Sequence, residues 1–147
     1  MKKIIAVLLL AALAYALVQA RGLSIPGFSA SPPATSDSSA VLAQAYVNRQ
    51  SDIQVEGVGI VVKVLADDRD GSRHQRFILR LANGQTLLVA HNIDLAPRIH
   101  ELKAGDDLGF YGEYEWNAQG GVIHWTHHDP GGRHVAGWLK HGGRIYQ

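Results

Sequence analysis

Residues 74–91, HQRFILRLANGQTLLVAH, decide the fold that the sequence predicts. From His74 to Leu81, apolar and charged side chains alternate, which is typical of a strand with one buried face. Asn83-Gly84 favours a tight hairpin turn, and Gln85 to His91 returns as a second extended segment. We therefore expect an antiparallel hairpin that places one face in the core.

The chain on either side of this hairpin also has strand-like patterns. Upstream, Val55 to Leu65 is rich in β-branched residues, and its two glycines indicate a bent strand or the close approach of another segment. Downstream, Leu108 to Trp116 alternates, a glycine-rich turn follows at residues 119–121, and Val122 to Asp129 is extended again. The sequence thus predicts five strands.

Between the third and fourth strands, Asn92 to Lys103 lacks the extended pattern and predicts a loop with a short helix near Pro97. Three strands, a helical connection and two more strands match a mainly β fold, a small five-stranded Greek-key barrel of the oligonucleotide/oligosaccharide-binding (OB) type. An open antiparallel sheet with one helix is the alternative. Residues 53–147 are expected to form this domain, with a C-terminal tail after the last strand.

The first 20 residues have the pattern of a secretory signal peptide. Lys2 and Lys3 precede an apolar run, and Val18-Gln19-Ala20 is a small-residue cleavage site. A retained signal anchor formed by residues 4–20 is the alternative, because Arg21 is an unfavourable neighbour for cleavage. We expect an exported, periplasmic protein that contacts the membrane only through an uncleaved N-terminal segment.

Two further segments precede the predicted barrel. Residues 21–36 are rich in Ser, Pro, Gly and Ala and predict a flexible linker. Residues 37–52 predict a helix that begins at Asp37 or Ser38 and packs on the barrel, since a helix this short is marginal alone.

The composition excludes several functional classes. The chain has 147 residues and no Cys, so it is neither a disulfide scaffold nor a thiol enzyme. It has 14 Lys+Arg and 13 Asp+Glu, and loss of Lys2 and Lys3 with the signal leaves 12 basic groups and a formal charge of −1. Polyanion binding must then be confined to one face. Ser72 is the only serine after Asp52 and lies in a polar turn, which argues against serine catalysis.

Several long motifs suggest a family. They are LLVAHNIDLAP at residues 87–97, GEYEWN at 112–117, GGVIHWTHHDP at 120–130 and GWLKH at 137–141. With these motifs, over about residues 45–147, the chain resembles an uncharacterised family of small exported bacterial proteins, known as a domain of unknown function. The resemblance implies an OB-like fold and an envelope location, and it supplies no established catalytic residue.

Histidines close to one carboxylate raise the hypothesis of a metal site. On a strand, residues two apart share a face at about 6.5–7 Å, so His127 and Asp129 are placed to share an ion. His91, Asp94 or His134 would supply a third ligand. Imidazole with carboxylate suits a divalent transition metal such as Zn²⁺. Structural hydrogen bonding by these histidines is the alternative.

Two further sets of residues are candidates for ligand contacts or catalysis. Glu113 and Glu115 share one strand face and could act as an acid pair or as the base beside a metal, although solvated charges on an outer face are the ordinary alternative. The ligand-binding candidates combine positive charge on the second strand with aromatic rings elsewhere: His74, Arg76, Arg80, Tyr111, Trp116, His124 and Arg133.

The sequence therefore favours a non-enzymatic, exported OB-fold binding protein without a cofactor, whose ligand is single-stranded nucleic acid, another polyanion or a saccharide. A metal-dependent hydrolase, such as a phosphodiesterase or nuclease, is the second hypothesis. A structural protein of the envelope is the third.

Overall fold

The computed structural model describes residues 35–147, so the predicted signal segment and nearly all of the predicted linker lie outside the described residues. No helix within this part of the chain is long and apolar enough to cross a membrane. The elements are α2 (Thr35–Asn48), β1 (Ile53–Val64), β2 (His74–Arg80), β3 (Thr86–Asn92), β4 (Asp107–Glu115), β5 (Val122–His124), β6 (Trp138–His141) and β7 (Arg144–Tyr146).

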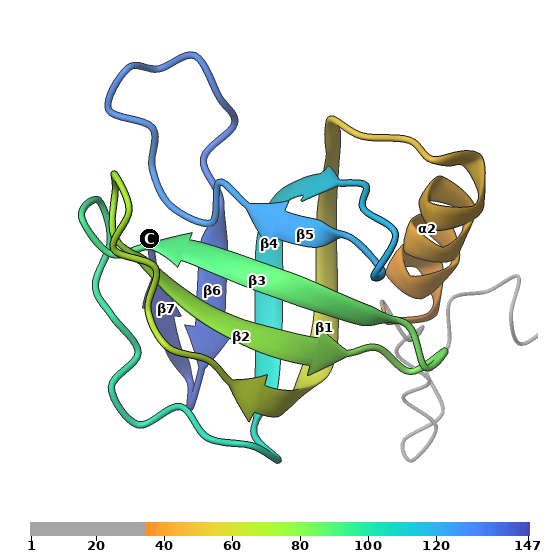
Figure 1. Ribbon diagram of the computed structural model, residues 1–147, viewed down its shortest axis with the longest axis horizontal. Coiled ribbons are helices and arrows are strands. Elements are labelled where there is room, and N and C mark those ends of the chain that lie inside the picture. Colours follow the sequence, from red (N-terminus) through yellow and green to blue (C-terminus); the bar gives the residue numbers. More distant parts are fainter. Residues whose placement is uncertain (1–34) are drawn as a thin grey trace, which may run out of the picture. The chain divides into compact units, whose positions relative to one another are not determined.

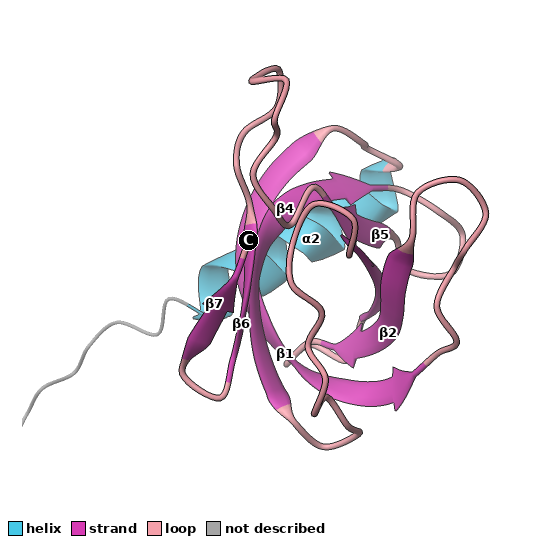
Figure 2. Ribbon diagram, turned by 90° about the vertical axis from the view of Figure 1, so that its left-hand side faces the viewer, coloured by secondary structure: helices cyan, strands magenta, loops and turns pink. Residues whose placement is uncertain are grey.

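Five of these strands close into a barrel (Figures 1 and 2). The strand order is β1-β2-β3-β5-β4, and β4 pairs back onto β1. Neighbours are antiparallel except β3 and β5, which are parallel. The prediction of a mainly β, OB-like Greek-key barrel is therefore confirmed.

β1 closes the barrel because it bends from one partner to the other. Residues 53–60 pair with β4, and residues 60–64 pair with β2 through a register shift between Val61 and Lys63. At Gly57 the Phe110 ring occupies the space that a Cβ would need, with Cζ 2.5 Å from that position. The expected bend and close approach are both present.

The barrel interior is filled with side chains, and each end is closed by a different segment. Phe77, Phe110 and Tyr114 are fully buried inside it. α2 covers one end with the buried side chains of Leu42 and Ala45 (Figure 1). The β3–β4 connection contributes buried side chains at the opposite end. A ligand must therefore bind outside the barrel.

The predicted short helix between the third and fourth strands does not form. Residues 93–106 consist of turns and irregular backbone. This conformation lets Ile99 and Leu102 enter the core. The buried Gln75 amide donates to the Ile99 carbonyl at 2.8 Å and accepts from the Ile99 N–H at 2.9 Å. The Gln75 side chain thus supplies the hydrogen-bond partners that a helix would otherwise give to the Ile99 backbone.

α2 begins at Thr35 rather than at Asp37 and ends at Asn48. Arg49 then adopts a left-handed φ of 54°, and its N–H and that of Gln50 return to the Tyr46 and Ala45 carbonyls at 3.2 and 2.9 Å. These two bonds form the C-terminal cap.

The C-terminal end of the sequence also differs from its prediction. The expected tail forms a β6–β7 hairpin, and β6 pairs with β4 through Gly109, Phe110 and Tyr111. The fifth strand ends at His124 instead of Asp129, because Trp125 has a φ of 52°, which interrupts an extended strand.

Candidate functional site

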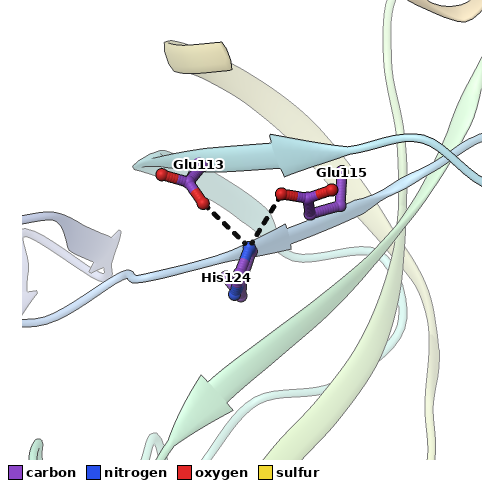
Figure 3. A group of neighbouring side chains, drawn as sticks. All are labelled: Glu113, Glu115 and His124. Carbon is purple, nitrogen blue, oxygen red and sulfur yellow. Dashed lines mark ion pairs between the residues drawn. The ribbon is translucent and has the colours of Figure 1, made fainter. Parts of the chain in front are cut away.

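The strand pair β4–β5 places three ligating side chains together on the outer face of the barrel. Glu113 lies directly opposite His124 in the register of the two strands, and Glu115 is two residues further along β4. The intervening Tyr114 points into the core. As Figure 3 shows, both carboxylates approach one edge of the His124 ring. One ligand atom from each residue lies within 4.8 Å of the others.

The electrostatics of this group depend on His124. Its Nε2 lies 3.4 Å from Glu113 Oε1 and 3.9 Å from Glu115 Oε1. This nitrogen is buried and has no hydrogen-bond partner among residues 35–147, although the side chain is 34% exposed overall. Burial lowers the pKa of His124, and the two glutamates oppose that change. The ring is therefore mostly neutral at pH 7, as a metal ligand must be.

The loop of residues 125–137 brings a second imidazole to the same carboxylate. The His134 ring stacks on Trp125 with centroids 3.7 Å apart, and His134 Nδ1 lies 3.9 Å from Glu113 Oε2. Asp129 holds this loop by accepting backbone hydrogen bonds from Gly131, Arg133 and His134 at 2.7–3.0 Å. Glu113 thus lies between His124 and His134.

His91, His127 and Asp129, which were predicted to form a metal site, instead form hydrogen bonds within the protein. The His91 ring contacts Thr126 Oγ1 at 2.8 Å and the Pro97 carbonyl at 3.1 Å, so both of its nitrogens are engaged. His127 Nδ1 lies 2.7 Å from the His128 carbonyl. Asp129 serves as the loop cap. Within residues 35–147, the group with three potential ligand atoms inside 4.8 Å is the Glu113–Glu115–His124 cluster.

This difference has a structural reason. Because β5 ends at His124, the two-residue alternation assumed for His127 and Asp129 does not apply to them. The convergence of Glu113 and His124 instead depends on the register between two strands, and the six-residue connection from Trp116 to Gly121 does not fix that register in the sequence.

Two of the three positive residues predicted on β2 form hydrogen bonds within the protein. The Arg76 guanidinium donates to the Ala66 carbonyl from Nε at 3.2 Å and from Nη2 at 3.1 Å. His74 Nδ1 lies 2.8 Å from the Ser72 carbonyl. Arg80 is exposed, and Arg133 is exposed on the loop.

The two predicted stacking residues have different roles. Trp116 packs against α2: its ring stacks on Tyr46 with centroids 6.5 Å apart, and its Nε1 donates to the Tyr46 carbonyl at 3.1 Å. Arg49 lies over the same ring at 5.4 Å. Tyr111 instead lies on the outer face of β4, beside Trp138 of β6.

A family model described as "Protein of unknown function (DUF3465)" matches residues 24–147. The chain belongs to this family. The DUF3465 match spans the whole described barrel, the Glu113–Glu115–His124 cluster and the β6–β7 hairpin, which confirms the predicted resemblance to an uncharacterised family. No curated protein matches the chain.

Proposed function

We propose that this DUF3465 protein binds a divalent transition-metal ion on the outer face of its barrel through Glu113, Glu115 and His124. The convergence of their three ligand atoms within 4.8 Å carries the proposal. The buried His124 Nε2, which has no hydrogen-bond partner in the described part of the chain, supports it, because an unpaired buried nitrogen is costly and an ion would satisfy it.

The distances fit the size of such an ion. Around tetrahedral Zn²⁺ with bonds of about 2.0–2.1 Å, neighbouring ligand atoms lie about 3.4 Å apart. His124 Nε2 is 3.4 Å from one glutamate oxygen and 3.9 Å from the other. Small rotations of partly exposed side chains therefore complete the coordination. A mixed imidazole and carboxylate set suits Zn²⁺, Mn²⁺ or Fe²⁺ better than the all-oxygen preference of Ca²⁺.

Three protein ligands would leave one coordination position for water or a substrate oxygen. An ion in this state lowers the pKa of its bound water, which is the chemistry of a metal-dependent hydrolase. His134 lies on the far side of Glu113, with Nδ1 3.9 Å from Glu113 Oε2, and would act there as a proton acceptor.

Isothermal titration of the chelator-treated full chain with Zn²⁺ and Mn²⁺ tests the proposal. We expect at least about tenfold weaker binding from each of three variants, Glu113→Gln, Glu115→Gln and His124→Gln. A loss of this size is typical when a metal ligand, or a residue hydrogen-bonded to one, is replaced. His128→Gln is the matched control, because His128 is exposed and outside the cluster. Absence of binding by the natural chain, or equal binding by all variants, would refute the site.

Hydrolysis is measured separately from binding. The same variants are incubated with a chromogenic phosphodiester and the ion. Turnover that requires Glu113 and His124 would establish hydrolase activity. Tight ion binding without turnover would support ion binding and refute hydrolysis of this substrate.

Polyanion binding at β2 is a second candidate, supported by Arg80. This side chain is exposed and forms no ion pair with any of residues 35–147. It borders a shallow hollow of about 430 Å³ lined also by Val58 and Ile60. Titration with a labelled single-stranded oligonucleotide at low and high salt tests this candidate, and Arg80→Gln should reduce both affinity and its salt dependence.

We also propose that the chain is exported to the periplasm, on the basis of residues 1–20. Fusing residues 1–34 to a reporter enzyme that is active only outside the cytoplasm tests the location. An inactive but stably produced fusion would refute it.

A further inference from the structure

We propose that the outer face of β4 and β6, beside the proposed ion site, is a binding platform for a neutral oligosaccharide. Tyr111 and Trp138 are direct partners across these two strands. Their ring centroids lie 6.2 Å apart with planes inclined at 35°, and both side chains are half-buried on the outside of the barrel. Two neighbouring aromatic rings on an outer strand face offer apolar surface against which a sugar ring can pack.

A glycine allows the tryptophan ring to lie close to the sheet. Gly109 is the β4 partner of Lys140, and the position of its missing Cβ is 3.5 Å from Trp138 Cζ3. The indole therefore rests over backbone rather than over a side chain. A branched side chain at this position would raise the ring away from the strand.

Polar groups border the two rings. Glu56 on β1 is the direct partner of Tyr111 and is exposed. Glu113 follows Tyr111 by two residues on the same face of β4, and Lys140 follows Trp138 by two residues on β6. The two carboxylates can accept hydrogen bonds from the hydroxyl groups at the edge of a sugar ring, and the Lys140 ammonium can donate one to them. A few polar groups around an apolar surface are the usual composition of a ligand site.

The charge of this face decides between the two ligand classes that OB barrels commonly bind, oligonucleotides and oligosaccharides. On β1, β4 and β6 the acidic residues outnumber the basic ones: Glu56, Asp107, Glu113 and Glu115 against Lys63 and Lys140. Without an ion at Glu113, Glu115 and His124, this negative charge repels a phosphate polymer but not a neutral sugar. With a divalent ion bound, the face is formally neutral and still offers a phosphate polymer no net attraction. The occupant is therefore a neutral oligosaccharide.

An array of neutral oligosaccharides, followed by titration of each hit against the full chain, tests this platform. Tyr111→Leu and Trp138→Leu should each weaken binding by about tenfold, the effect of losing one stacking ring. Gly109→Val should weaken it without removing a polar group. Trp116→Phe is the control, because Trp116 packs against α2. Thermal melting establishes that each variant is folded.

The outcomes separate this proposal from the ion site. Titrations are repeated with chelator and with Zn²⁺, so sugar binding is read whether or not an ion binds. Binding to the array that depends on Tyr111 and Trp138 supports the platform. No binding to any neutral oligosaccharide, or hits unaffected by the variants, would overturn it. A stronger response to a single-stranded oligonucleotide that depends on the same two rings would also overturn it.

Discussion

Gly121 is a position at which the backbone and its surroundings both exclude a side chain. Its φ is 108°, and a Cβ would overlap the ring of the fully buried Tyr114. We expect Gly121→Ala to lower the free energy of unfolding by about 2–4 kcal/mol, from backbone strain and overpacking together. Urea unfolding measures the change.

Gly84→Ala separates the two causes. Gly84 has a φ of 87° but open space around it, so only the backbone cost of about 1–2 kcal/mol applies. Equal losses in the two variants would mean that the Tyr114 contact contributes nothing.

At the scale of elements, α2 is held to the barrel by one narrow stripe. Leu42 is completely buried at the barrel end, whereas Val47 on the same helix is 74% exposed. Leu42→Ala should cost about 2–5 kcal/mol of unfolding free energy, and Val47→Ala less than about 0.5 kcal/mol. Circular dichroism during urea unfolding measures both, and similar losses would contradict the described packing.

The loop of residues 125–137 depends on Asp129. Its three backbone hydrogen bonds lower the pKa of its carboxyl, Arg133 N–H first, then Gly131 N–H, with His134 N–H a smaller contribution. We expect Asp129→Ala to accelerate amide exchange of these residues and to leave the strands protected, which hydrogen-exchange mass spectrometry measures.

Asp68→Ala is the control for that experiment, because Asp68 caps a different turn by accepting from the Asp70 N–H at 3.0 Å. Its effect should stay within the β1–β2 connection. Unchanged exchange near His134 in Asp129→Ala would show that other contacts position the loop.

The elements themselves could largely be predicted from the sequence, because alternation within β2, β3 and β4 is a local property of each strand. Residues 92–103 were predicted as a loop with a short helix, and only the helix was wrong, since the Gln75 side chain that pairs with Ile99 is distant in the sequence. The grouping of Glu113 with His124 was also missed, although both residues were candidates. Their approach follows from strand register, which single residues do not encode.

At the scale of the whole molecule, buried His91 makes stability depend on pH. Burial is the main cause that lowers its pKa from 6.5 to about 4. Between these values the unfolded chain binds a proton that the folded chain does not, so stability falls as the pH falls through this window. The expected loss is about 3 kcal/mol between pH 7 and pH 4.

Urea unfolding at several pH values measures this dependence. His91→Gln should remove most of this dependence between about pH 6.5 and pH 4, and His124, whose pKa is also lowered by burial, accounts for a smaller residual slope. Below that window, carboxylates take over: backbone and side-chain hydrogen bonds from Lys103 lower the pKa of Asp106 to about 2, so its contribution is lost as the pH falls from 3.8 towards 2. A slope that persists undiminished in the variant would assign the effect to other groups.

β4 is hydrogen-bonded along both edges, to β1 on one side and to β6 and then β5 on the other. The outward side chains of Tyr111, Glu113 and Glu115 therefore project from a backbone that can move only if the hydrogen bonds to its neighbouring strands break. An ion of a different radius would therefore be accommodated by rotation of these side chains and not by a shift of the strand.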